Sequence, residues 1–337
     1  MNGRDRILAA LRGEPTDRVP VLLHNFLMAA RENGVPQSRF RRDGRAVAES
    51  FIRAVETYDY DGVLVDVSTA MLAGALGVPV DYPEDQPARC KGPLIPSLEA
   101  VPDLPPPDVS GFFEIEAALE AVRILKDHFG AGIAVRGNAD QCPFSLASMV
   151  RGLDHWLMDL IDADPARIEA LLDYCLSATR QFLELMAEAG ADILSNGDSP
   201  AGPDLVSPAV YRRFARPWEK ACADQAHALG RPYILHICGN TGPILEDMIG
   251  TGADGLELDY KTNARRARET LAGRACFIGN IDPSGVLALG TPEKVEEATR
   301  ELLALFAGNP RFILNAGCAI PAETPPANLR ALIRAAR

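Results

Sequence analysis

The chain has 337 residues, of which 47% are hydrophobic and 24% are charged, and its formal net charge is -12 at pH 7. This length and composition fit a globular enzyme built either from two average domains or as one large barrel. The acidic balance argues against nucleic acid as a partner, because phosphate binding needs a dense basic surface. No apolar run is long enough to cross a bilayer and no signal peptide is evident, so we expect a cytoplasmic protein without a membrane partner.

Short apolar or β-branched runs alternate along the chain with longer amphipathic stretches. Strands are predicted at 19–24, 62–67, 133–138, 192–198, 233–239, 255–260, 276–281 and 312–318. The stretches between them repeat apolar residues at three and four positions, which predicts helices at 46–58, 116–129, 165–190, 208–230 and 292–308. A strand, helix, strand order indicates parallel pairing.

Eight such units in sequence favour an α/β fold of the (β/α)8 TIM-barrel type, with residues 1–337 as a single domain and a helical extension at the N-terminus. An open doubly wound sheet would usually carry fewer strands and a glycine-rich phosphate turn after the first. No such turn follows 19–24, and the segment 279–285 (GNIDPSG) lacks the G-x-G-x-x-G spacing.

Polar or metal-binding side chains follow nearly every predicted strand, and the carboxyl ends of barrel strands meet at one mouth. Polar strand ends also occur simply because loops are polar, so a single Asp or Asn there decides little. From this set we expect catalytic roles for Asp198 and Glu257 and cofactor contacts from Asn25, Asn138 and Asn280. The full set is His24, Asn25, Asp66, Asn138, Asp140, Asn196, Asp198, His236, Cys238, Glu257, Asp259, Asn280, Asp282, Asn315 and Cys318.

The run YILHICGN, residues 233–240, places a histidine and a cysteine two positions apart. Side chains two apart on a strand face the same way, so His236 and Cys238 both point where Ile234 points, into the barrel or its mouth. Cys318 ends the last strand and is the best third ligand, whereas Cys276 begins its strand and belongs at the far end. One imidazole and two thiolates suit zinc, and three protein ligands leave the fourth position open, as in catalytic sites.

Other interpretations of these three residues remain open. The two cysteines can serve as buried apolar packing or as a redox pair, and His236 can be a core histidine bonded to a backbone carbonyl. Asp198 or Glu257 can also fill or gate the fourth ligand position.

The chain resembles the uroporphyrinogen decarboxylase-like superfamily over nearly its whole length. Within that superfamily it is most similar to the zinc-dependent methyltransferases that pass a methyl group from a methylated corrinoid protein to a thiol such as coenzyme M. The resemblance rests on RILAALRGEPTDRVPV, IDADPARIEALL, GDSPAGPDLVSPAVYRRFARPW, HICGNTGPIL, GNIDP and NAGCAIPAETPPANL. It implies that His236, Cys238 and Cys318 bind zinc, and that methylcobamide on a corrinoid protein donates the methyl group to a zinc-activated thiol.

The decarboxylases themselves differ from this chain at two places. Their arginine-bearing stretch near the N-terminus has no match in VLLHNFLMAARENG, and Gly317-Cys318 stands where they carry Gly-His. These two differences argue against porphyrinogen decarboxylation. The alternatives to methyl transfer are a uroporphyrinogen decarboxylase-like enzyme and a non-catalytic tetrapyrrole- or corrinoid-binding protein. Related enzymes that demethylate methoxy compounds use a carboxylate-rich zinc pattern and would apply only if the triad were misread.

Overall fold

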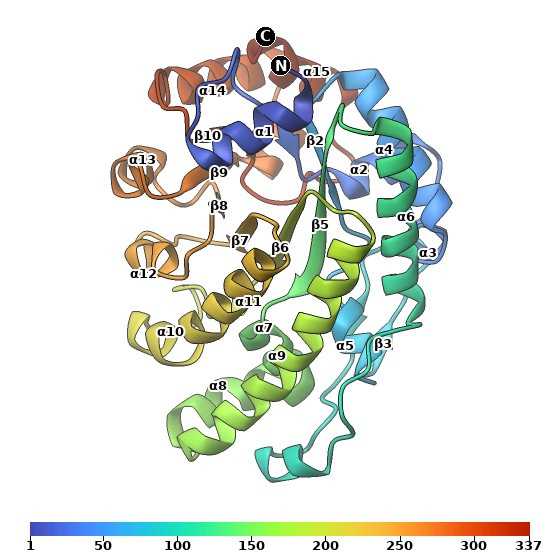
Figure 1. Ribbon diagram of the computed structural model, residues 1–337, viewed down its shortest axis with the longest axis vertical. Coiled ribbons are helices and arrows are strands. Elements are labelled where there is room, and N and C mark those ends of the chain that lie inside the picture. Colours follow the sequence, from blue (N-terminus) through green and yellow to red (C-terminus); the bar gives the residue numbers. More distant parts are fainter.

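The computed structural model of the protein describes residues 1–337. Eight parallel strands form one sheet in the order β1-β2-β5-β6-β7-β8-β9-β10 (Figure 1). A bridge between Val21 and Leu314 joins the first strand to the last, so the sheet closes into a barrel. The TIM-barrel prediction is confirmed. The strands are β1 (Leu22–Leu23), β2 (Gly62–Val65), β5 (Ala134–Gln141), β6 (Ile193–Gly197), β7 (Tyr233–Ile237), β8 (Gly255–Leu258), β9 (Cys276–Ile281) and β10 (Phe312–Ala316).

Helices surround the barrel because their apolar stripes, repeated at helical spacing, can be buried only against the outer face of the sheet. The helices are α1 (Gly3–Arg12), α2 (Phe26–Glu32), α3 (Gln37–Phe40), α4 (Gly44–Tyr58), α5 (Met71–Ala75), α6 (Phe113–Phe129), α7 (Pro143–Arg151), α8 (Leu153–Asp162), α9 (Pro165–Glu188), α10 (Pro208–Phe214), α11 (Arg216–Ala228), α12 (Leu245–Ile249), α13 (Ala264–Leu271), α14 (Pro292–Leu305) and α15 (Pro326–Ala335). Three shorter helical turns are η1 (Leu98–Asp103), η2 (Ser199–Ala201) and η3 (Pro283–Ala288). None of the helices combines the length and apolar composition that crossing a bilayer requires.

The predicted helix at 208–230 is in fact two helices, α10 and α11, which meet at Ala215. Pro217 lies at the start of α11. A proline there has no N–H to donate and its ring crowds the preceding turn, so the chain begins a new helix instead of continuing the old one. The predictions at 165–190 and 292–308 differ from α9 and α14 only at their C-terminal ends.

The N-terminal extension closes one end of the barrel. Ile7, Ala10 and Leu11 of α1 pack with a layer of inward-facing residues from the strands, and all of them are buried. This apolar plug leaves only the carboxyl ends of the strands open to a substrate. The strand residues of the layer are Leu22, Leu64, Ala134, Ile193, Ile234, Cys276, Ile278 and Ile313.

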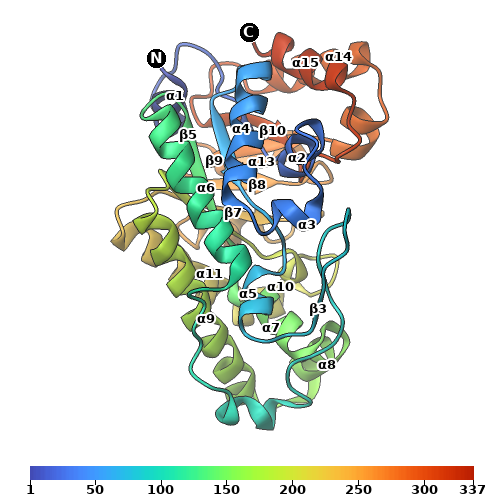
Figure 2. The same cartoon turned by 90° about the vertical axis from the view of Figure 1, so that its right-hand side faces the viewer.

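The opposite end, the mouth, carries the excursions of the chain. The hairpin of β3 (Val80–Asp81) and β4 (Arg89–Cys90) and helices α3, α8 and α10 lie on the side of the barrel away from α1 (Figure 2). Two strands end earlier than predicted here, β7 at Ile237 and β10 at Ala316, whereas β5 continues to Gln141, past the predicted end at 138. Cys238 and Cys318 therefore lie just beyond the strands, where the backbone turns outward.

Candidate metal centre

The metal triad proposed from the sequence comes together at the mouth. His236 Nε2 lies 3.2 Å from Cys238 Sγ and 3.8 Å from Cys318 Sγ, and the two sulfur atoms are 3.6 Å apart. These three residues are the only group of His, Cys, Asp or Glu side chains whose potential ligand atoms lie close enough to share a metal ion. No carboxylate completes the set, so the group is a three-ligand site.

These distances fit zinc. Zinc bonds of about 2.1 Å to nitrogen and about 2.3 Å to sulfur separate the ligand atoms of a tetrahedral site by roughly 3.6 to 3.8 Å. The three separations require shifts of only a few tenths of an ångström to reach these values. Two soft sulfur donors with one imidazole suit zinc rather than calcium or magnesium, which take oxygen ligands.

The two cysteines differ in protonation although their sulfur atoms are neighbours. A hydrogen bond from Cys318 to the Cys238 sulfur lowers the pKa of Cys238 to about 3 against the effect of burial, and the adjacent His236 lowers it further. The same contact raises the pKa of Cys318. Burial alone would lower the pKa of His236, but the Cys238 thiolate outweighs burial and raises it to about 9. Cys238 is thus already favoured as a thiolate. Deprotonation of Cys318 as well would require a cation such as a metal ion beside the two sulfur atoms.

Glu257 contacts His236 through its backbone carbonyl and not through its carboxylate. The backbone carbonyl of Glu257 accepts a hydrogen bond from His236 Nδ1 at 3.0 Å, which leaves Nε2 free to face the sulfur atoms. The Glu257 carboxylate is fully buried, lies 2.5 Å from Arg136 Nη1 and accepts a hydrogen bond from Asn315 Nδ2 at 3.0 Å. Burial raises the pKa of Glu257, but Arg136, His24 and His236 together outweigh burial, and the pKa lies well below its usual value. Such second contacts fix the orientation of a metal-binding histidine.

His24 is a site residue to which the sequence reasoning assigned no role. Its ring lies edge-on to the His236 ring with 6.2 Å between centroids. Its nitrogen atoms lie 3.4 Å from Glu257 Oε1 and 3.8 Å from Asp66 Oδ2. The signal was available in the sequence, because His24 is two positions after the inward-facing Leu22, just as His236 is two after Ile234.

The three asparagines expected to contact a cofactor lie in different surroundings. Asn138 faces inward, donating from Nδ2 to Asp66 at 3.1 Å. Asn280 lies at the end of β9 and donates to the carbonyls of Asp259 and Thr262 at 3.0 Å each, so it anchors the loop after β8. Asn25 precedes α2 and is buried, with its amide 3.4 Å from the Tyr60 hydroxyl rather than against the triad.

Asp198 does not lie in the mouth, contrary to the expectation from the sequence. Ser195 faces inward, where its hydroxyl accepts from Arg136 Nε at 2.8 Å. Alternation along the strand then turns Asp198 outward. Asp198 is fully buried, and its carboxylate accepts from the backbone N–H and the hydroxyl of Ser145 in α7 at 2.8 and 2.5 Å. A catalytic role for Asp198 therefore has no support from its position.

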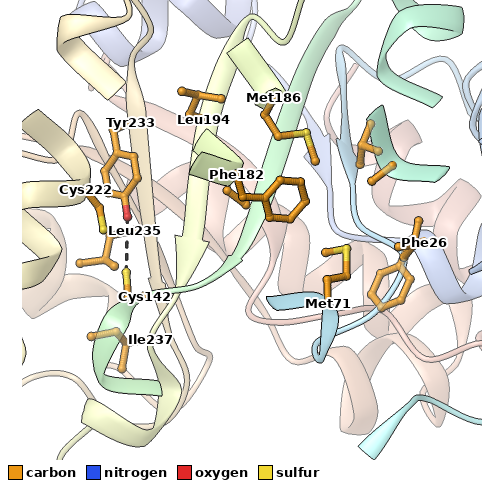
Figure 3. Close-up of a cluster of buried hydrophobic side chains, with 14 of the residues drawn as sticks. Phe26, Met71, Cys142, Phe182, Met186, Leu194, Cys222, Tyr233, Leu235 and Ile237 are labelled. Atoms are coloured by element: carbon orange, nitrogen blue, oxygen red, sulfur yellow. Dashed lines mark hydrogen bonds between the residues drawn. The ribbon is translucent and has the colours of Figure 1, made fainter. Parts of the chain in front are cut away.

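The outward side of β6 and β7 holds a second buried polar cluster. Tyr233, Leu235 and Ile237 point from β7 away from the barrel axis, with Cys142 and Cys222 beside them (Figure 3). The Tyr233 hydroxyl lies 3.5 Å from Cys142 Sγ and donates to Asn196 at 3.0 Å. This outer cluster, which also includes Asp198, Tyr211 and Glu219, is sealed between the sheet and α7, α10 and α11.

Comparison with known proteins agrees with the fold and with the sequence resemblance. The chain is 29% identical to the methylcobamide:CoM methyltransferase MtbA of Methanosarcina acetivorans, over 99% of this chain and 97% of that protein. It is 30% identical to the uroporphyrinogen decarboxylase of Thermus thermophilus, over 98% of this chain and 96% of that protein. The solved structure of a methyltransferase from Methanosarcina mazei matches with a TM-score of 0.91 and 27% identity, over 99% of this chain and 98% of that one. Residues 2–337 match the family Uroporphyrinogen decarboxylase (URO-D), and the chain belongs to that family.

Proposed function

We propose that this protein transfers a methyl group from a methylated, protein-bound corrinoid to a small thiol, using a zinc ion held by His236, Cys238 and Cys318. Relatives named as methyltransferases and relatives named as decarboxylases both match the whole chain, so family membership alone does not choose between the two reactions. The observation that carries the proposal is the triad, because decarboxylation has no evident use for two cysteines and a histidine in metal-binding geometry.

The residues around the triad prepare it to bind a metal and a thiol. Zinc bound there would supply a Lewis acid that keeps a coordinated thiol deprotonated at neutral pH. Cys238 and Cys318 contribute two negative charges, which balance the metal and leave the acceptor sulfur electron-rich. His236 is held in one tautomer by the Glu257 carbonyl, so its Nε2 lone pair is directed to the site.

The proposed reaction is a nucleophilic displacement. The thiolate sulfur of the acceptor attacks the methyl carbon, a carbon–sulfur bond forms, and the cobalt–carbon bond breaks. Its electron pair remains on cobalt, so methyl-Co(III) becomes Co(I) and the thiol becomes a thioether. The chain contributes position and charge balance, since the thiol proton is released when the thiol is bound and no protein acid is needed afterwards.

The alternative of a non-catalytic corrinoid- or tetrapyrrole-binding protein predicts a fourth protein ligand that closes the site. The two carboxylates considered for that position are both engaged elsewhere. Asp198 faces outward to Ser145, and Glu257 is paired with Arg136. The open fourth position thus favours an exchangeable ligand, as transfer requires.

The experiment that tests the proposal mixes purified protein with free methylcobalamin and a thiol and follows the cobalamin absorption spectrum. We expect demethylation that depends on protein, on thiol and on metal, and that stops after treatment with a chelator. Circular dichroism should remain near normal after chelation, because the barrel core does not rely on ligands at its rim. Methyl transfer that continues at full rate in metal-free protein would overturn the proposal.

A further inference from the structure

The class of acceptor thiol can be inferred from the charges around the triad, if the proposed function holds. Two cationic side chains other than His236 lie in the barrel interior beneath the triad, and both are already neutralised. Arg136 is 1% exposed and lies 2.5 Å from the Glu257 carboxylate. His24 lies between the carboxylates of Glu257 and Asp66, at 3.4 and 3.8 Å. A protein carboxylate therefore balances the positive charge of each side chain, although both His24 ring nitrogens and Arg136 Nη1 lack a hydrogen-bond partner.

The other carboxylates of the inner wall, Asp66 and Asp259, accept hydrogen bonds from the protein and add no positive charge. Asp66 is held by the amide of Asn138 and by the backbone N–H of Ser68. Asp259 accepts from the backbone N–H groups of Gly239 and Lys261 at 2.9 Å each. The interior beneath the triad therefore combines Arg136 and His24 with Glu257 and Asp66, which gives no excess of positive charge.

Four cations on the segments that follow the strands are also paired. Lys261, after β8, lies 3.9 Å from Asp204. Arg31 in α2 pairs with Glu323 at 2.9 Å. On the β3–β4 hairpin, Arg89 and Lys91 both face Asp81, at 3.3 and 3.7 Å. These pairs are exposed and individually weak, but each of the four cations has a protein carboxylate beside it.

We propose that the acceptor is a small thiol without an anionic tail, so that coenzyme M, the acceptor in the names of the methyltransferase relatives, is not the preferred substrate of this chain. A sulfonate two carbons away from a metal-bound sulfur must lie inside the mouth. A buried anion is stable only beside a cation or several hydrogen-bond donors that it can claim. The positive charges of His24 and Arg136 are already balanced by carboxylates of the protein. A hydroxyl or an ammonium group in the position of the sulfonate would not bury an unpaired negative charge.

Three thiols with the same two-carbon spacer test this directly: coenzyme M, 2-mercaptoethanol and cysteamine, which end in a sulfonate, a hydroxyl and an ammonium group. Methyl transfer from free methylcobalamin is measured for each and divided by its uncatalysed rate, which removes differences in intrinsic thiol reactivity. Binding of each thiol to the zinc-loaded and to the metal-free protein is measured by calorimetry. We expect 2-mercaptoethanol and cysteamine to equal or exceed coenzyme M in both measurements.

The variant Asp66→Asn sharpens the test. It removes one of the two carboxylates that neutralise His24, so the ratio of coenzyme M to 2-mercaptoethanol should rise on the order of tenfold. The control is Asp162→Asn, which makes the same change in net charge at an exposed position in α8 and should leave the ratio unchanged. Thermal melting shows whether Asp66→Asn folds, and if it does not, the ranking of the three thiols by the unmodified protein decides.

Each outcome separates this inference from the proposed function. A preference of the unmodified protein for coenzyme M over 2-mercaptoethanol by about tenfold or more overturns the inference but supports methyl transfer. Failure to demethylate methylcobalamin with any of the three thiols overturns the proposed function itself. An equal shift of the ratio in Asp66→Asn and Asp162→Asn would show that overall charge, not the wall of the mouth, sets the preference.

Discussion

The inner and outer sides of β6 and β7 both bury cysteines beside ionisable groups, yet they differ in what they can do. On the inner side, Cys238 is half-buried at the mouth and its pKa is lowered to about 3 by Cys318, with a further contribution from His236. On the outer side, Cys142 is fully buried and its pKa is raised well above the usual value, mainly by burial and then by Cys222.

This difference follows from the alternation of side chains along a strand. Neighbouring residues of β7 face opposite sides of the sheet, and only those facing inward converge on the mouth of the barrel. The outer cluster is instead closed by helices and can only stabilise or destabilise the fold. The reactivity of a cysteine here therefore depends more on which side of the sheet it faces than on its residue type.

The largest effect should come from removing a ligand on the inner side. In Cys238→Ala, Cys318→Ala and His236→Ala we expect metal content to fall from about one zinc per chain to near zero. Methyl transfer should fall by more than the roughly 100-fold typical of losing an outer-shell contact. Metal analysis and the cobalamin assay measure these effects. Cys142→Ala on the outer side is the matched control and should keep its zinc; equal metal content in all variants would refute the site.

Breaking the buried ion pair under the triad should have the next largest effect. Arg136→Met removes the nearer of the two cations beside the buried Glu257 carboxylate and leaves only His24, at 3.4 Å, so we expect a loss of about 3–5 kcal/mol in the free energy of unfolding. Urea denaturation measures it. The double variant Arg136→Met/Glu257→Leu should recover much of that stability, since no charge is then left unpaired. A double variant no more stable than Arg136→Met would contradict this account of the pair.

On the outer side, Asp198→Ala should reduce stability without reducing metal content. The change leaves the backbone N–H and hydroxyl of Ser145 without their acceptor, which costs about 1–3 kcal/mol. Thermal melting and zinc analysis of the same preparation measure the two quantities. If transfer were lost in Asp198→Asn at normal stability, Asp198 would regain the catalytic role expected from the sequence.

The smallest effect concerns the pH dependence of stability. Burial, with the neighbouring Asp198, raises the pKa of Glu219 well above its usual value, so folding favours the protonated form. Its contribution is fully present below about pH 4.3, the usual glutamate pKa, and is lost as pH rises through the folded-state pKa. Urea denaturation of Glu219→Gln should give a stability that declines less with pH from about 5 to 8 than that of the unmodified protein. Identical slopes would exclude Glu219 as a source of this dependence.

Much of the fold was predictable from the sequence, and so was the core of the site. The eight apolar runs are the eight barrel strands, and the two-residue spacing of His236 and Cys238 placed both on one face. Asn25 and Asp198 were both chosen because they follow a strand. The structure places Asn25 against Tyr60 and Asp198 against Ser145, neither of which is a residue of the triad. Alternation along β6 from the inward-facing Ile193 turns Asp198 outward, and counting from Ile193 would have shown this.

The sequence by itself determined what depends on local order: the alternation of strands and helices, and the shared face of His236 and Cys238. Only the tertiary structure decided which distant residues join them. Cys318 reaches Cys238 across eighty positions because β10 closes the barrel against β1, and His24 reaches Glu257 for the same reason. Arg136 meets Glu257 across the interior of the barrel. These contacts depend on how strands from separate parts of the chain pack around one axis, and no local pattern of residues specifies that arrangement.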